Sequence, residues 1–231
     1  PGPQMGWRAP GEKRPCIPKF QYYSVYRERA PKDPSRVVTS DGVTFRRMPD
    51  GADAVYVVGE YHFDDIGPED IVLDIGANVG AFCIRAARRS RRVLAVEPVL
   101  AGALQENVRE NGVSVTVVSG ALGGGGDERI TWGGRTLTVA TRTLGEFAGM
   151  IGGCDFLKCD CEGAEWSIRP ADLDGVRRIE MELHVPPIGG PVNRRLLDYI
   201  GEHYDFTIDR TPGYAALGVM GVLHAARRSR D

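Results

Sequence analysis

The sequence has no apolar run that approaches the ~18 residues needed to span a bilayer, so we expect no membrane-embedded protein. It also has no excess of one charge: 29 lysine and arginine residues face 31 aspartate and glutamate residues, a net charge of −2. Proteins that bind nucleic acid non-specifically need a large positive field. A nucleic-acid partner is therefore not expected.

Cysteine is scarce, and lysine supplies only four of the 29 basic residues. The five cysteines are an odd number without a CxxC pair, which argues against a disulfide framework and favours the reducing cytoplasm. No secretion signal is recognisable, in agreement with that location. The cysteines are Cys16, Cys83, Cys154, Cys159 and Cys161. Core packing explains 154, 159 and 161 better than a metal site, because their spacing is not that of a zinc centre.

The chain divides by composition into an N-terminal appendage, residues 1–60, and a main domain, residues 61–231. The appendage begins with a Pro-, Gly- and Arg-rich arm. Residues 36–45 predict a β-hairpin that turns at Asp41-Gly42, and residues 54–58 predict a further strand.

Strand and helix patterns alternate in the main domain, which predicts an α/β fold with right-handed crossovers between parallel strands. The last two strands follow each other without a helix, which favours a final antiparallel pair. Strands are expected at 71–74, 92–96, 113–118, 154–160, 177–183, 206–208 and 217–223. Helices are expected after 79 and at 100–108, 143–151 and 196–200, with an extra hairpin at 130–139 and a loop at 123–126.

A glycine-rich turn follows the first of these strands, and a carboxylate ends the second. The turn reads Asp74-Ile-Gly-Ala-Asn-Val-Gly80, and Glu97-Pro98 closes the next strand. Ligands of open α/β sheets bind beyond the carboxyl ends of the strands, where such a carboxylate can accept both ribose hydroxyls. The pair of motifs indicates a cofactor that contains a nucleoside.

The spacing of the glycines separates the candidate cofactors. A dinucleotide site would show GxGxxG aimed at a pyrophosphate, which Asp74 would repel, whereas this turn has GxxxG. S-adenosylmethionine carries an ammonium group and a sulfonium cation, which a carboxylate favours. We therefore prefer S-adenosylmethionine; NAD and a purely structural glycine turn are the alternatives.

Four segments together resemble the FkbM family of S-adenosylmethionine-dependent methyltransferases. They are residues 72–80, Glu97-Pro98, the block Phe156-Leu-Lys-Cys-Asp-Cys-Glu-Gly-Ala-Glu165, and Ile179-Glu-Met-Glu-Leu-His184. The resemblance covers residues 55–225 and implies a Rossmann-like class I methyltransferase fold, with seven mostly parallel strands and the last strand antiparallel. It also implies O-methylation of hydroxyl groups on natural products and sugars.

The resemblance and the motifs assign provisional roles to the strand ends. The amino-acid end of the cofactor is expected at Asp74, Gly76, Ala77, Asn78 and Gly80, and the ribose at Glu97 and Pro98. The adenine is expected to lie against Gly120 and Ala121. Asp160 is expected to lie near the methyl group of the cofactor. The acceptor pocket is expected to use residues 1–60 and 127–142, together with Tyr61, His62 and Phe63 unless these three only pack in the core.

Methyl transfer to an alcohol requires alignment of the acceptor and removal of its proton. Candidate bases are Asp160, Glu162 and His184; Lys158, on the same strand face as Asp160, could pair with a carboxylate or hold an anionic group. Two other interpretations stay open. Asp160, Glu162, Glu182 and His184 could hold Mg²⁺, or some of these carboxylates could be structural. Glu165 is the strongest structural candidate, as an acid in the first turn of a helix.

The sequence thus predicts a cytoplasmic O-methyltransferase that acts on a small hydroxylated molecule, either as a monomer or as a homodimer. An RNA methyltransferase is the main alternative, although the fourth strand lacks the Asn/Asp-Pro-Pro-Tyr/Phe block of base-methylating enzymes. The other alternative is a non-catalytic relative that only binds the cofactor. The arginines at 85, 88, 89, 91 and 92 suggest a solvated helix end rather than a nucleic-acid patch.

Overall fold

The computed structural model describes residues 35–39, 41–46, 61–132, 135–210 and 217–229. The predicted arm and the predicted strand at 54–58 lie outside these residues. The main sheet contains β3 (Ile71–Ile75), β4 (Arg92–Val96), β5 (Thr116–Val118), β9 (Phe156–Cys159), β10 (Arg178–His184), β11 (Tyr204–Asp209) and β12 (Val219–Arg227). The helices are α2 (Ala81–Ala86), α3 (Ala101–Glu110), α4 (Leu144–Ile151) and α5 (Arg194–His203), with 3₁₀ turns η1 (Ala164–Ser167) and η2 (Pro170–Leu173).

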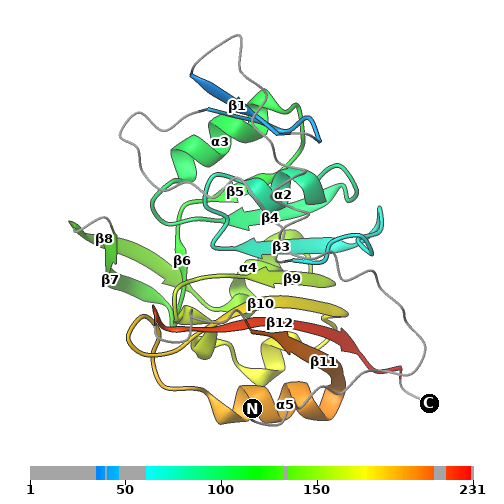
Figure 1. The fold of residues 1–231 in the computed structure, drawn as a ribbon, viewed down its shortest axis with the longest axis vertical. Helices are drawn as coiled ribbons and strands as arrows, with labels where there is room; N and C mark the ends of the chain where they lie inside the picture. The colour runs from blue at the N-terminus through cyan, green and yellow to red at the C-terminus, as the bar shows by residue number, and fades with distance from the viewer. Residues whose placement is uncertain (1–34, 40, 47–60, 133–134, 211–216, 230–231) are drawn as a thin grey trace.

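The seven strands lie in the order β11-β12-β10-β9-β3-β4-β5 (Figure 1). Neighbours from β10 to β5 are parallel, while β12 runs antiparallel to both β10 and β11. This is the expected Rossmann-like sheet with its last strand reversed. The chain runs outward from β3 to β5 and then returns to β9, so β3 and β9 flank the point where the winding reverses, which is the usual ligand position in such sheets.

Alternate residues of the strands enter two separate cores, one on each face of the sheet. Leu73 and Leu157 pack with α4, α5 and the 3₁₀ turns, whereas Val72 and Phe156 pack with α2 and α3. This period of two explains why short, wholly apolar runs form the central strands. None of the helices in the described part of the chain has the length and apolar character to cross a bilayer.

The predicted N-terminal hairpin is present as β1 (Arg36–Val38) and β2 (Thr44–Arg46), joined through Asp41-Gly42. Phe45 on β2 is fully buried in the core beside α2 and α3. The side chains of Asn107 on α3 and of Asn111, the residue that caps its C-terminus, accept hydrogen bonds from backbone N–H groups of β2, both at 2.9 Å. The hairpin is therefore fixed to the helical layer of the main sheet.

Arg85 corrects the expectation of a solvated arginine cluster. Its side chain is only 2% exposed, and its guanidinium donates to the Asp41 carboxylate at 2.7 Å. Arg88 donates to the carbonyl oxygens of Asp41 and Gly42, so these two arginines clamp the hairpin turn to α2.

A second, three-stranded sheet lies at the end of the main sheet where the parallel strands finish (Figure 1). It contains β6 (Ala121–Leu122), β7 (Gly126–Trp132) and β8 (Arg135–Arg142), with β8 in the middle. The predicted hairpin at 130–139 is thus longer at both ends, and β7 already begins in the predicted glycine loop.

Replacement of Phe45 tests whether the hairpin belongs to the folded core. Phe45→Ala removes a fully buried ring and should lower the free energy of unfolding by about 3–5 kcal/mol. The adjacent Arg46→Ala, which removes a 55%-exposed side chain, should change it by less than about 1 kcal/mol. Urea denaturation followed by circular dichroism measures both; equal effects would contradict a core role for the hairpin.

Candidate active site

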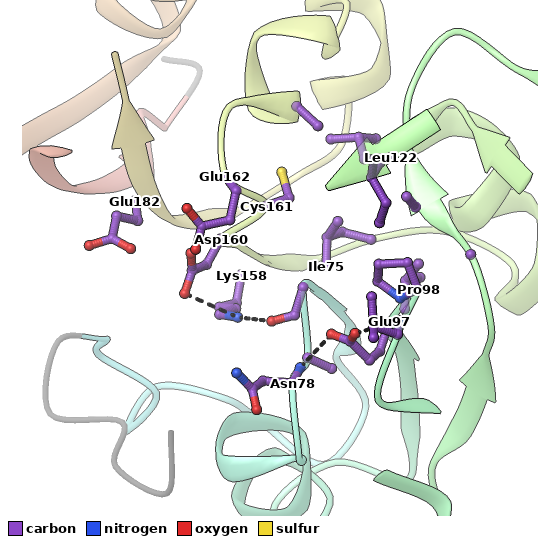
Figure 2. A pocket seen from close by; sticks show the side chains of 18 of the residues that line it. Ile75, Asn78, Glu97, Pro98, Leu122, Lys158, Asp160, Cys161, Glu162 and Glu182 are labelled. Atoms are coloured by element: carbon purple, nitrogen blue, oxygen red, sulfur yellow. Dashed lines mark hydrogen bonds and ion pairs between the residues drawn. The ribbon is translucent and has the colours of Figure 1, made fainter. Parts of the chain in front are cut away.

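A cavity of about 810 Å³ lies at the carboxyl ends of the central strands, within the size range of small-molecule sites. Residues from three regions line it: the first turn and the end of β4, the ends of β9 and β10, and the small sheet. Figure 2 shows Glu97 and Asn78 on one side, with Asp160, Glu162 and Glu182 on the other. The predicted residues in the lining are Tyr61, Gly76, Ala77, Asn78, Glu97, Pro98, Gly120, Ala121, Lys158, Asp160, Glu162 and Glu182.

The first turn is held open by its backbone and by Glu97. Gly76 and Asn78 have positive φ angles of 76° and 51°, and a side chain at residue 76 would collide with the Asp160 carbonyl. Glu97 accepts the N–H groups of Asn78, Val99 and Leu100 at 2.8–3.0 Å. Its carboxylate therefore has a fixed orientation at the cavity wall. Oε1 accepts two of these bonds and Oε2 only one, so Oε2 keeps a lone pair for a ligand.

Lys158 connects the first turn to β9 from below. Its ammonium donates to the Gly76 carbonyl at 2.7 Å and pairs with Asp74 at 3.1 Å, and Asp160 lies 3.9 Å away. Burial lowers the pKa of Lys158, but the charges of Asp74 and Asp160 outweigh it and raise that pKa. Lys158 therefore remains charged, and its ammonium group already has its hydrogen-bond and ion-pair partners inside the protein.

Asp74 lies beneath the cavity, outside the lining. Its carboxylate is fully buried and accepts the Cys83 N–H at 3.1 Å. Burial raises the pKa of Asp74, and Lys158 opposes that rise. Gly80 also lies outside the lining, where it begins α2 with φ 98° and leaves no room for a side chain beside Leu104. Asp74 and Gly80 therefore support the turn from outside the cavity.

A buried row of charged residues crosses four strands in register. Asp74 on β3 stands opposite Lys158 on β9, Lys158 opposite Glu180 on β10, and Glu180 opposite His224 on β12. The Glu180 carboxylate is hydrogen-bonded to the His224 ring at 2.6 Å and forms an ion pair with the Arg178 guanidinium at 3.0 Å. Sequence reasoning missed Glu180 and His224, because only the strand order brings them into this row.

Residues 61–63 lie across this row. The Tyr61 hydroxyl donates to Asp160 at 2.9 Å, and its ring lies 5.3 Å from the Lys158 ammonium. His62 stacks on His224 at 4.2 Å between ring centroids, and its N–H donates to Glu180. Of these three predicted residues, Tyr61 reaches the cavity, while His62 and Phe63 pack outside its lining.

Three carboxylates surround the imidazole of His184 at the other end of the cavity. The His184 Nε2 atom lies 3.5 Å from oxygens of both Glu162 and Glu182, and 3.9 Å from Asp160. His184 is 1% exposed and lies behind the lining. Burial lowers its pKa, but hydrogen bonds to Glu165 and Glu182 and the nearby charges raise the pKa to about 10.

Glu165 lies in the first turn of the 3₁₀ helix η1 and holds backbone groups of the fold, as expected for a structural acid at a helix start. Its side chain is fully buried, and it accepts the backbone N–H groups of His184 at 2.6 Å and Gly163 at 2.8 Å. The same Oε1 lies 3.3 Å from His184 Nδ1. Glu165 thus fixes the ring and directs Nε2 toward the three carboxylates.

The small sheet supplies a wall of the cavity through Glu128, Ile130 and Thr131 on β7. This placement agrees with the expected contribution of residues 127–142, whereas most of residues 1–60 lie outside the described part of the chain. Ile188, which sequence reasoning missed, also lines the cavity and is 44% exposed. Cys159 and Cys161 face away from Lys158, with their sulfurs 3.3 Å apart.

The site geometry coincides with a family match. The profile of the methyltransferase FkbM domain matches residues 74–208, more than half of the chain. The chain belongs to the FkbM methyltransferase family. Its match extends from the first turn, through the Lys158–Glu165 block, to β11. A comparison with curated proteins gave no match.

Solved methyltransferase structures give further, distant similarities. An O-methyltransferase from Bacillus cereus in complex with SAH has 18% identity and a TM-score of 0.45, over 69% of this chain and 74% of that one. Magnesium protoporphyrin IX methyltransferase from Synechocystis PCC 6803 has 16% identity and a TM-score of 0.43, over 70% of this chain and 71% of that one. An rRNA methylase from Streptococcus thermophilus has 10% identity and a TM-score of 0.47, over 71% of this chain and 90% of that one. The strand order itself, rather than these similarities, establishes the fold.

Removal of one partner from the buried Asp74–Lys158 pair should destabilise this FkbM-family protein strongly. Asp74→Asn leaves the Lys158 charge buried and should cost about 3–5 kcal/mol of unfolding free energy. The same change in an exposed pair, Asp205→Asn beside Arg228, should cost less than about 1 kcal/mol. Urea denaturation distinguishes the two positions, and the double variant Asp74→Asn with Lys158→Met should cost less than the sum of its single changes. Additive costs would show that the pair is not coupled.

Proposed function

We propose that the protein transfers a methyl group from S-adenosylmethionine to a hydroxyl oxygen of a small molecule. The observation that carries this proposal is the continuity of the cavity. One space connects Glu97, at the end of β4, with Asp160, Glu162 and Glu182, at the ends of β9 and β10. A nucleoside and a hydroxylated acceptor could therefore occupy the same cavity side by side.

The residues at the Glu97 end fit an S-adenosyl group. The Glu97 carboxylate is oriented by three backbone N–H groups at the strand end where a ribose is expected. Val96, Pro98, Val99 and Leu122 give this part of the cavity an apolar wall, which suits a purine ring. Gly120 and Ala121 also line this part, in agreement with the expected adenine position.

The residues at the other end suit proton removal from an alcohol. S-adenosylmethionine would supply a methyl group activated by a cationic sulfur. Asp160, which is 29% exposed and held by Tyr61, and the more exposed Glu162 offer carboxylate oxygens to an acceptor hydroxyl. Burial and the neighbouring carboxylates raise the pKa of Glu162, although His184 opposes that rise. A raised pKa makes a carboxylate a better proton acceptor.

The charge of this end favours a small neutral or cationic acceptor over RNA. Asp160, Glu162 and Glu182 converge there, and Lys158 already has its partners inside the protein. A phosphate backbone brought to the cavity mouth would be repelled by these carboxylates. The net charge of −2 provides no compensating positive field.

Binding of S-adenosylhomocysteine tests the cofactor end. Glu97→Gln removes the charge that would accept a ribose hydroxyl and should weaken binding by at least about tenfold, or about 1.4 kcal/mol. Glu182→Gln, the same change at the other end of the cavity, should leave the affinity within about threefold. Isothermal titration calorimetry measures both, with the melting temperature as the control for folding. Equal affinities in the wild type and Glu97→Gln would refute the assigned ribose position.

Methyl transfer tests the acceptor end. The wild-type protein is incubated with labelled S-adenosylmethionine and a panel of polyols, sugars, phenols and short RNAs. We expect transfer to hydroxylated small molecules, with a loss of about 10²–10⁴-fold in kcat in Asp160→Asn and an unchanged affinity for S-adenosylhomocysteine. Transfer only to RNA would overturn the proposed acceptor class.

A further inference from the structure

We propose that His184, Glu162, Asp160 and Glu182 form a binding site for one divalent transition-metal ion, of which Mn²⁺ is the probe. Its role in activating the acceptor rests on the proposed function, but its binding does not. The Nε2 atom of His184 faces oxygens of all three carboxylates at 3.5–3.9 Å. The ligand atoms of Asp160, Glu162 and His184 all lie within 4.8 Å of one another.

These separations are those of ligands around a common ion. Metal–ligand bonds of ~2.0–2.2 Å place neighbouring ligands ~3–4 Å apart. Three carboxylates that converge on one imidazole also repel one another. A single imidazolium balances at most one of their charges, so a divalent ion between them removes an unfavourable interaction. Glu162 has 60% of its side chain exposed and can move to complete the coordination.

The surroundings of His184 provide an independent argument for a ligand role. A metal-bound imidazole commonly has its other ring nitrogen held by a carboxylate, which fixes the tautomer and orients the free nitrogen. Glu165 does this here: it is fully buried, lies 3.3 Å from Nδ1 and is itself fixed by two backbone N–H groups. Nε2 is then the nitrogen available to an ion.

The donor set also indicates the class of metal. Carboxylate oxygens suit Mg²⁺, Ca²⁺ and Mn²⁺, whereas imidazole suits transition metals such as Zn²⁺ and Fe²⁺. One imidazole combined with carboxylates is a set that Mn²⁺ satisfies on both counts. Because Asp160, Glu162 and Glu182 line the cavity, such an ion would be open to the acceptor and could lower the pKa of its hydroxyl.

His62, Glu180 and His224 form another histidine–carboxylate group among the described residues, but they suit a cation less well. The Glu180 carboxylate there already pairs with the Arg178 guanidinium at 3.0 Å and with His224 at 2.6 Å. A metal ion there would be repelled by the Arg178 guanidinium. This group therefore serves as an internal control.

Electron paramagnetic resonance of free Mn²⁺ tests the proposal without an acceptor. The full chain, treated with EDTA and then dialysed, is titrated with MnCl₂. We expect one bound ion per chain, and a loss of at least about tenfold in affinity in Glu162→Gln and in Glu162→Gln/Glu182→Gln. His62→Gln, the control at the other group, should bind Mn²⁺ like the wild type. Glu162→Gln changes a mostly exposed side chain, so its folding should be unaffected.

The result that would overturn the proposal is the absence of a bound ion up to millimolar Mn²⁺, or binding that Glu162→Gln leaves unchanged. Loss of binding in His62→Gln instead would also overturn it, because it would place the ion at Glu180. Calorimetry of S-adenosylhomocysteine on the same samples separates the two proposals. Intact cofactor binding without Mn²⁺ binding contradicts the metal site alone.

Discussion

The cavity depends on the buried contact between Lys158 and the first turn. The Lys158 ammonium ties β9 to both Asp74 and the Gly76 carbonyl, at 3.1 and 2.7 Å. These contacts fix the turn that carries Asn78 relative to the strand that carries Asp160. The distance between the proposed cofactor and acceptor ends is therefore set inside the protein, by a buried ion pair.

This pair is part of a longer arrangement that explains why charged residues are tolerated on a buried sheet face. A buried charge is costly unless it has a partner, and along this row carboxylates alternate with cationic or histidine side chains. Asp74, Lys158, Glu180 and His224 stand in register on four adjacent strands. Residues 61–62 then cover the row through contacts with Asp160, Glu180 and His224, which links the start of the main domain to the active-site cavity.

The sequence was sufficient for features that depend on local pattern. Apolar runs that end in Asp74, Glu97 and Asp160 predicted the strands, and the period of two placed Lys158 and Asp160 on one face. Features that depend on distant partners were not predictable in this way. Arg85 is buried because Asp41, 44 residues earlier, is folded onto it, and Glu165 is buried because it meets His184 on another strand. The first contact depends on where the hairpin packs and the second on β10 lying beside β9, and no local pattern encodes either.

The two ends of the cavity are built differently, and this difference bears on how the family can accept different substrates. The Glu97 end consists of strand termini and a turn, and three backbone N–H groups fix the Glu97 carboxylate there. β7 of the small sheet and the exposed Ile188 also line the cavity, and both lie outside the main sheet. Substitutions in these borders can reshape the pocket without disturbing Lys158 or Glu97. Fixed strand ends and a separate wall together would let this fold form cavities of different shape.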